Sequence, residues 1–411
     1  MMETFKKLAR VVVLSAVGSV IWATPAISSA QDSVSPVREY QCRGSQGYAE
    51  DFDGRRTFLW RPQWLEAISA DSERRKDAIS RADKALGRGP YSVTDKSKLV
   101  PGASPDDYTS IGPYWWPDPK KSDGLPYKRR DGEVNPERSG PDFDKERLSK
   151  LGSDMEDLSV GYYLTGDARY AQHAAVLVRA WFLDPETRMA PNMDFAQGIP
   201  GRVNGRGEGI IEASDFSTVV ESVGLIAPSS ALGDDEMKGL KIWFAQFAQW
   251  LATSDNGTAE MQKTNNHGVF FDFYLSHFAL FAGLDSVTKD ITSNFPEFRL
   301  RRQMDTQGRF IAELKRTRSW HYSNYIVAGA GRLATIGECV GEDLWNAQLD
   351  DGRGLATATR FLDEYSDQIE TWPFPDRDLA AKRIDRMERV HGLVDTLFAR
   401  GESFPEGSQL P

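Results

Sequence analysis

The stretch "DFDKERLSKLGSDMEDLSVGYYLTGDARYAQHAAVLVRAWFLD", Asp142 to Asp184, decides the fold class. It indicates two helices joined by Thr165-Gly166-Asp167. Gly166 can adopt the left-handed conformation that ends a helix, and Asp167 can cap the helix that follows. A link this short makes neighbouring helices antiparallel, so the stretch predicts a helical hairpin.

Helical signals continue on both sides of this hairpin. Upstream, Pro62 suits a first helical turn and Gly87 suits a helix end. Downstream, the sequence predicts helices near 213–226, 234–254, 267–283, 321–336, 353–370 and 376–399. Alternating strand patterns bounded by hairpin turns are scarce. We therefore expect an all-α fold of packed helical hairpins, with long polar loops at 99–141 and 185–212 of the kind that usually carry function.

The N-terminus is typical of a signal peptide spanning residues 1–30. Lys6, Lys7 and Arg10 precede the apolar core "VVVLSAVGSVIWA", and Ala30 suits the cleavage point. The apolar core is too short for a comfortable membrane span, and polar sequence follows at once. We expect an exported protein, periplasmic or secreted and not held in a membrane, whose residues 31–411 form a single domain.

Charge and cysteine content narrow the functional class. The whole chain has a formal charge of −10, and removing a leader of net +2 leaves −12. This argues against nucleic acid as a partner but allows a polyanionic substrate in a locally basic cleft. Cys42 and Cys339 are the two cysteines, and they could pair in an oxidising compartment or stay free. Neither the cysteines nor the histidine spacing predicts a metal site.

The first long loop contains "SIGPYWWPDPKKSDGLPYKRRDGEVNPE", from Ser110 to Glu137. Its prolines stiffen the chain, and its aromatic and basic residues include Tyr114, Trp115, Trp116, Arg129 and Arg130. Aromatic rings pack on the apolar faces of sugars, and guanidinium groups pair with carboxylates. The loop therefore suits an acidic polysaccharide. Equally, its tryptophans could pack on the body with the basic residues in solvent.

The second long loop, "MAPNMDFAQGIPGRVNGRGEGIIEASDF" from Met189 to Phe216, places polar side chains among glycines. Asn192, Gln197 and Arg206 are its candidate ligand-binding residues. Glycines permit close approach of a ligand to the backbone. The alternative is a glycine-rich loop shaped only by its own packing.

Two later stretches each set polar groups at the start of an apolar helix. "TNNHGVFFDFYLSHFALFAG" begins with Asn265, Asn266 and His267, and at least one of these asparagines could be an ordinary N-cap. "ELKRTRSWHYSNY", from Glu313 to Tyr325, offers two arginines followed by two tyrosines.

Eliminative cleavage of a uronic-acid chain needs these residue types. The proton on C5, next to the carboxylate, must be removed, and the C4–O bond to the neighbouring sugar must break. Amide, imidazole and guanidinium donors on the carboxylate stabilise the enolate-like charge. A tyrosine whose phenol pKa is lowered by a neighbouring arginine can take the proton, and can protonate the leaving oxygen on the same face. Neither a metal nor an organic cofactor is required.

Five motifs in order resemble the alginate lyase superfamily over about residues 90–345: "PYWWPDP", "PYKRRDGEVNPE", "FAQGIPG…GRGEGII", "NNHGVFFD" and "ELKRTRSWHYSNY". The chain is similar to the helical-toroid branch that acts on alginate or related polyuronates such as glucuronan. The resemblance implies an incomplete (α/α) toroid with the substrate in a groove along one end. It also implies an Asn–His pair and an Arg…Tyr pair as the catalytic group.

On this resemblance, Asn266 and His267 are the catalytic Asn–His pair. Two Arg…Tyr pairs are open: Arg316 with Tyr322, which we favour because Arg316 follows "EL" and Tyr322 opens "YS", and Arg318 with Tyr325. We expect a lyase that cleaves a β-1,4-linked mannuronate or glucuronate chain. The expected substrate-binding residues are Tyr114, Trp115, Trp116, Arg129, Arg130, Asn192, Gln197, Arg206, Asn265, Arg318, His321 and Tyr325.

Two other functional classes are alternatives. A non-catalytic protein of the same fold would hold an anionic polysaccharide without cleaving it. A glycoside hydrolase would need paired carboxylates, for which Asp154, Glu156 and Asp157 are candidates, although we interpret them as a solvated helix face. Of the remaining histidines, His277 lies in an apolar run and is interpreted as a core residue, and His173 and His391 have no partner visible in the sequence.

Overall fold

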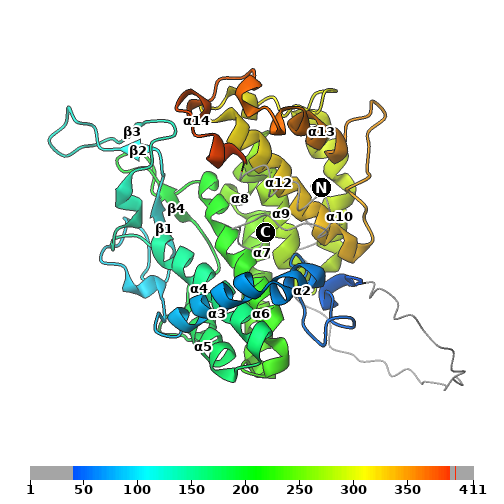
Figure 1. Ribbon diagram of the computed structural model, residues 1–411. Coiled ribbons are helices and arrows are strands. Elements are labelled where there is room, and N and C mark those ends of the chain that lie inside the picture. The colour runs from blue at the N-terminus through cyan, green and yellow to red at the C-terminus, as the bar shows by residue number, and fades with distance from the viewer. Residues whose placement is uncertain (1–39, 389–393, 395–411) are drawn as a thin grey trace, which may run out of the picture.

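The computed structural model describes residues 40–388 and residue 394 (Figure 1). The predicted signal peptide and His391 lie outside the described residues. The helices are α2 (Pro62–Ala70), α3 (Ser72–Ala85), α4 (Lys145–Thr165), α5 (Ala168–Val178), α6 (Ser214–Ile226), α7 (Asp234–Thr253), α8 (Asp255–Met261), α9 (Asn266–Phe281), α10 (Asp285–Phe295), α11 (Arg301–Gln303), α12 (Ser319–Gly337), α13 (Leu355–Ser366) and α14 (Arg377–Ala380). Within this part of the chain, no helix combines the length and the apolar character needed to span a bilayer.

The predicted helical hairpin is confirmed in α4 and α5. Gly166 adopts the left-handed conformation with φ 72°, and its backbone N–H donates to the carbonyl of Tyr162, which ends α4. The Asp167 side chain accepts from the backbone N–H of Arg169 at 3.0 Å and so caps α5. Gly166 acts through its own backbone and Asp167 through its side chain on a residue two positions away, which explains why the sequence alone predicted both.

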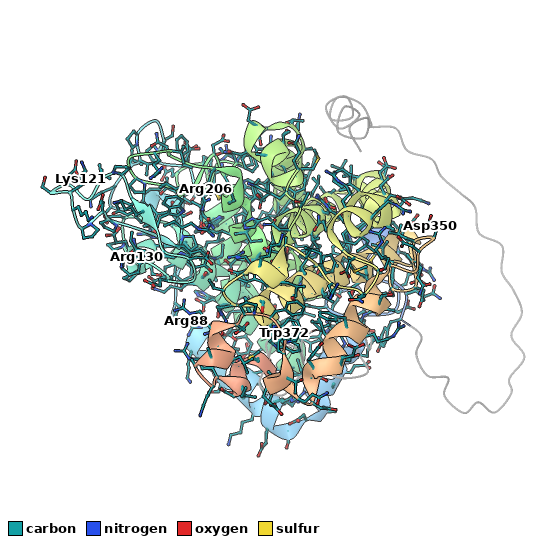
Figure 2. All side chains as sticks on the ribbon, turned by 90° about the horizontal axis from the view of Figure 1, so that it is seen from above. Arg88, Lys121, Arg130, Arg206, Asp350 and Trp372 are labelled. Atoms are coloured by element: carbon teal, nitrogen blue, oxygen red, sulfur yellow. A yellow bond between two sulfur atoms is a disulfide. The ribbon has the colours of Figure 1, made fainter. Side chains whose placement is uncertain are left out.

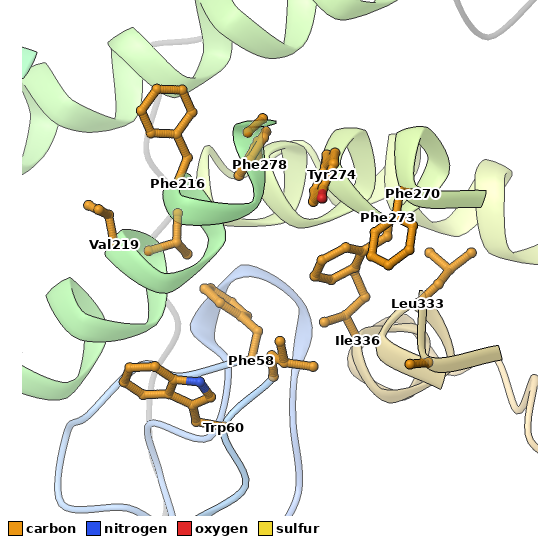
Figure 3. Close-up of a cluster of buried hydrophobic side chains, with 14 of the residues drawn as sticks. Phe58, Trp60, Phe216, Val219, Phe270, Phe273, Tyr274, Phe278, Leu333 and Ile336 are labelled. Atoms are coloured by element: carbon orange, nitrogen blue, oxygen red, sulfur yellow. The ribbon is translucent and has the colours of Figure 1, made fainter. Parts of the chain in front are cut away.

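The helices form an all-α, toroid-like fold, as predicted. Helix α4 packs against α3, α5 and α6, while α9 packs against α7, α10 and α12. Almost every residue of α9 is buried, because this helix is apolar on all sides and runs through the middle of the fold. Figure 3 shows the side chains of α6, α9 and α12 meeting those of the segment around Phe58 and Trp60 in the core.

Two helix predictions differ from the structure. Between Pro62 and Gly87, Asp71 ends α2 and caps α3 by accepting from two backbone N–H groups, so this segment is two helices. The stretch predicted as helical from 376 is interrupted after the short helix α14, where Lys382 has φ 57°. A left-handed residue of this kind cannot continue an α-helix, and the helix resumes only at 384.

The two predicted loops are ordered against each other. Strand β1 (Thr109–Ile111) of the first loop pairs in parallel with β4 (Phe195–Gly198) of the second. Strands β2 (Trp115–Trp116) and β3 (Lys128–Arg129) form an antiparallel hairpin. This hairpin projects from the helical body, and Lys121 lies at its outer end (Figures 1 and 2).

The structure decides two further points that the sequence left open or misjudged. Cys42 and Cys339 form a disulfide that ties the N-terminal segment to the end of α12. The interpretation of the α4 carboxylates as a solvated helix face was wrong. Asp154 and Asp157 are buried, and they pair with Arg88 and Arg81 respectively. Helix α3 packs on this side of α4, and Arg81 of α3 and Arg88 just beyond its end reach the two carboxylates.

Candidate active site

One cavity of about 520 Å³ brings the separate motifs together. Its walls come from the two long loops, the junction of α8 and α9, the segment that leads into α12, and the first turns of α12. Most of the predicted site residues line it: Tyr114, Trp115, Arg129, Gln197, Arg206, Asn265, Asn266, His267, Arg316, His321, Tyr322 and Tyr325. The structure places four others outside its lining: Trp116, Arg130, Asn192 and Arg318.

The two asparagines at the start of α9 have different structural roles. Asn265 is the N-cap, because its side-chain oxygen accepts from the backbone N–H of His267 at 3.2 Å. Asn266 is buried, and its side-chain Nδ2 donates to the two carboxylate oxygens of Glu313 at 3.0 and 2.9 Å. Its backbone N–H donates to the same carboxylate at 2.6 Å. Glu313 therefore fixes the Asn266 amide in the cavity wall.

His267 and the glycine after it are also set by distant partners. The His267 Nδ1 atom lies 2.5 Å from Oε1 of Glu260, a residue of α8 that is only 1% exposed. At Gly268, a Cβ atom would lie 2.2 Å from the carbonyl oxygen of Lys263 and 2.4 Å from Nη1 of Arg299. Glycine is therefore needed here for α9 to begin so close to these groups.

Tyr322 has both an arginine and a second phenol beside it. The Arg316 guanidinium carbon lies 3.7 Å from the centre of the Tyr322 ring. The hydroxyl oxygens of Tyr322 and Tyr114 are 2.9 Å apart. Burial raises the pKa of Tyr322 above its ordinary value, and Arg316 opposes this only in part. The expectation of a net lowering by the arginine is therefore wrong for the substrate-free cavity, because desolvation of the phenol outweighs the cation.

Arg316 also has a donor with nothing to bind in the described part of the chain. Its Nε atom is buried without a hydrogen-bond partner there, and its nearest acid, Asp131, is 3.7 Å from Nη2. By contrast, Arg318 lies outside the cavity lining, and its Nε donates to Asp378 at 2.8 Å. Of the two arginines, Arg316 is the one that faces the cavity beside a tyrosine.

Tyr325 and His321 form a stacked pair at the cavity wall. Their ring centres are 5.8 Å apart with an interplanar angle of 9°, and Tyr325 also stacks on Phe270 at 4.2 Å. Burial raises the pKa of Tyr325 to about 12. Burial and then the charge of Arg318 lower the pKa of His321 to about 4, so this histidine is neutral near pH 7. Tyr325 thus stacks with one aromatic ring from α9 and one from its own helix, α12.

The cavity contains more cationic than anionic side chains. Gln197, with φ 48°, binds Arg206 at two points: its carbonyl accepts from Nε at 3.0 Å and its Oε1 from Nη2 at 2.8 Å. Lys263 donates to Glu208 at 2.7 Å. Burial opposes the charge of Glu208, but the hydrogen bond from Lys263, a backbone N–H and the charge of Arg206 together hold its pKa below the ordinary value. With Arg129 and Arg316, four cations face one acid in the lining, an environment that suits a polyanion.

The tryptophans of the projecting hairpin are covered by arginines. Arg202 lies over Trp115 at 5.4 Å from the ring centre, and Arg130 lies over Trp116 at 4.9 Å. In Figure 2, Arg130 lies in this projecting part and Arg206 lies nearer the body. Asn192, outside the cavity lining, donates to Asp107 at 3.2 Å. Arg130 of the hairpin and Arg202 of the second loop thus stack on the hairpin's two tryptophans, an arrangement that neither interpretation of the first loop predicted.

Comparisons with known proteins agree with this geometry. The family model described as alginate lyase matches residues 92–372. The chain belongs to the alginate lyase family. The crystal structure of an alginate lyase from Bacteroides ovatus is 32% identical, covers 86% of this chain and 96% of its own, and superposes with a TM-score of 0.78. Alginate lyase A1-III from Sphingomonas species A1 is 15% identical, with a TM-score of 0.48 and coverage of 78% and 86%. No curated protein matches the chain.

Membership of the alginate lyase family makes this chain a polysaccharide lyase and confirms the resemblance carried by the five motifs. It also agrees with the toroid-like fold. The hydrolase alternative loses its candidates, because Asp154, Glu156 and Asp157 are all buried and none of them lines the cavity. Within residues 40–388, no group of three or more His, Cys, Asp and Glu side chains is placed to hold a metal ion.

Sequence reasoning missed several charged residues of this alginate lyase family site. Glu208 and Lys263 line the cavity, while Glu313 and Glu260 bind Asn266 and His267 from behind. Glu313 opens the quoted motif "ELKRTRSWHYSNY", and a carboxylate placed among arginines was the signal available for it. Glu260 had no such signal, because α8 itself was not predicted as a helix.

Proposed function

We propose that this protein cleaves a β-1,4-linked polyuronate, alginate or polymannuronate or glucuronan, by β-elimination. The observation that carries the proposal is the joint presence of Asn266, His267, Arg316 and Tyr322 in the lining of one cationic cavity. Mannuronate and glucuronate share the arrangement at C4 and C5 that lets a single tyrosine serve both proton transfers. The related Bacteroides ovatus protein is named as an alginate lyase, which supports alginate as the first substrate to test.

The proposed reaction begins with the uronate carboxylate bound to Asn266, His267 and Arg316. Their donors stabilise the negative charge that moves onto the carboxylate as the bond between C5 and hydrogen breaks. The Tyr322 phenolate accepts that proton, the electron pair forms the C4=C5 double bond, and the C4–O bond breaks. Tyr322 then returns the proton to the leaving oxygen. Because burial raises the pKa of Tyr322, the nearby Arg316 is needed to make the phenolate accessible.

The cationic lining supports a polymer of acidic sugars as substrate rather than a neutral glycan. Arg206 is held rigidly by Gln197, and a pre-organised guanidinium loses little freedom when it pairs with a carboxylate. Trp115 with Arg202, at the hairpin, offers an aromatic face and a cation together. We assign these residues to the binding of sugar units adjacent to the one that is cleaved.

The test is to incubate the purified mature protein with polymannuronate, polyguluronate and glucuronan. A lyase produces an unsaturated sugar end, so the ultraviolet absorbance of the new C4=C5 double bond rises. A non-catalytic binding protein would be retained on the polymer without this rise, and a hydrolase would release saturated sugars. Folded protein that produces no unsaturated ends from any of the three polymers would overturn the proposal.

We further propose that the protein acts outside the cytoplasm, in the periplasm. Residues 1–30 have the composition of a signal peptide. The disulfide between Cys42 and Cys339 supports the same location, since disulfides persist in oxidising compartments. Expression in a bacterial host, fractionation and mass spectrometry should find a periplasmic chain that begins at Gln31. An uncleaved chain retained in the cytoplasm would contradict this.

A further inference from the structure

Behind His267 lies a buried carboxylate that the proposed reaction does not use directly. Glu260 is 1% exposed, whereas the His267 side chain is 19% exposed and lines the cavity. Oε1 of Glu260 contacts Nδ1 of His267, and Oε2 is buried without a hydrogen-bond partner among the described residues. Helix α8 therefore places a carboxylate directly against the imidazole, behind the cavity lining.

This contact determines which imidazole nitrogen carries a proton. An ionised carboxylate can only accept hydrogen bonds, so the short contact requires a proton on Nδ1 of His267. The nitrogen left for the cavity is then Nε2. A carboxylate behind a histidine fixes the ring orientation and the tautomer in the same way in other protein sites.

The charge of Glu260 matters because the cavity is already cationic. Arg129, Arg206, Arg316 and Lys263 line it, and Glu208 is the acid among the lining residues. A His267 that donates from Nε2 to a uronate carboxylate must carry protons on both nitrogens and so adds a further positive charge. Glu260 supplies a negative charge in direct contact with that imidazolium, at a position the substrate cannot reach.

We propose that Glu260 is a positioning residue for the lyase reaction: it holds the proton on Nδ1 of His267 and balances the imidazolium that donates from Nε2 to the substrate carboxylate. The inference rests on the proposed function. The inference goes beyond the proposed function because it assigns a role to a residue that touches neither the substrate nor the reacting atoms. Glu260 acts only through His267, so its effect on catalysis must disappear when His267 is absent.

Two variants separate charge from hydrogen bonding. Glu260→Gln keeps an oxygen that can accept from Nδ1 but has no charge, and Glu260→Leu has neither. We expect kcat to fall by about 10–100-fold in Glu260→Leu, with a smaller change in KM, and to recover in part in Glu260→Gln. A change confined to KM in both variants would overturn the inference.

A double-mutant cycle tests whether Glu260 acts through His267. Adding Glu260→Leu to His267→Ala should cause no further loss of kcat, because the group that Glu260 positions is gone. A full additional loss of about 10–100-fold would show that Glu260 acts by another route.

Glu221→Gln is the matched control: Glu221 contacts His277 at 2.7 Å, and both are fully buried outside the cavity. It should lower the free energy of unfolding and leave kcat unchanged.

A spectroscopic measurement keeps the inference testable even if no substrate is cleaved. The ¹⁵N chemical shifts of His267 should report a proton on Nδ1 in the wild type and in Glu260→Gln. In Glu260→Leu the proton should move to Nε2 or be shared between the two nitrogens. An unchanged tautomer in Glu260→Leu overturns the inference. If the tautomer changes as expected but the wild type makes no unsaturated product, the proposed function fails and not the positioning role.

Discussion

Replacing Tyr322 with phenylalanine removes one hydroxyl group and little else. The ring is 8% exposed and would keep its contact with Arg316, 3.7 Å from the ring centre. The structural loss is one hydrogen bond to Tyr114, whose hydroxyl oxygen is 2.9 Å away. Neutral hydrogen bonds of this kind contribute about 0.5–1.5 kcal/mol to stability. The variant should therefore fold, and its free energy of unfolding should fall by about 1 kcal/mol.

The catalytic loss should be far larger. General acid–base catalysis contributes about 10²–10⁴-fold for each proton transfer, and in the proposed reaction Tyr322 performs both transfers. Turnover should therefore fall by about 10⁴-fold or more, while retention on immobilised polymannuronate changes by less than about tenfold. Initial rates come from the ultraviolet absorbance of unsaturated ends, and unfolding free energies come from urea titration.

Tyr325→Phe is the matched control for Tyr322→Phe. Tyr325 also lines the cavity, and its ring would keep its stacking contacts with Phe270 and His321 without its hydroxyl. We expect turnover within about tenfold of the wild type. If Tyr325→Phe abolishes turnover and Tyr322→Phe keeps it, the assignment of the base is wrong and Tyr325 takes the role. If both variants remain active, neither Tyr322 nor Tyr325 is the base of the elimination.

Three further predictions concern stability. The folded-state pKa of His321 is about 4, below its ordinary 6.5, so the unfolded chain binds more protons between these values. Stability should fall as pH drops from 6.5 to 4, by about 3 kcal/mol, and urea titration should show a smaller fall in His321→Gln. Gly268→Ala should lower the free energy of unfolding by about 1–3 kcal/mol, through the close contacts its Cβ would make; equal stability would show that the helix start can shift. Reducing the Cys42–Cys339 disulfide, which spans 297 residues, should cost about 2–5 kcal/mol, and an unchanged melting temperature would contradict this.

Several features of this protein follow from residues close together in the sequence. Gly166 and Asp167 end one helix and start the next through their own backbone and side chain, and Asn265 caps α9 in the same local way. The apolar run after His267 predicts a buried helix because apolar residues dominate it over several helical turns. The residue types in the motifs were also enough to predict a cavity for an acidic sugar, and the structure brings most of them to one place.

Only the tertiary structure decided which protonation states and partners these residues have. Glu260 and Glu313 bind His267 and Asn266 from other elements, and neither contact follows from spacing along the chain. Tyr322 was expected to have a lowered pKa because Arg316 is near it in sequence, yet burial raises it. Helix caps and periodicity depend on neighbours a few residues away. Desolvation and charge pairing depend on which distant segments cover a side chain, and that is settled only when the chain has folded.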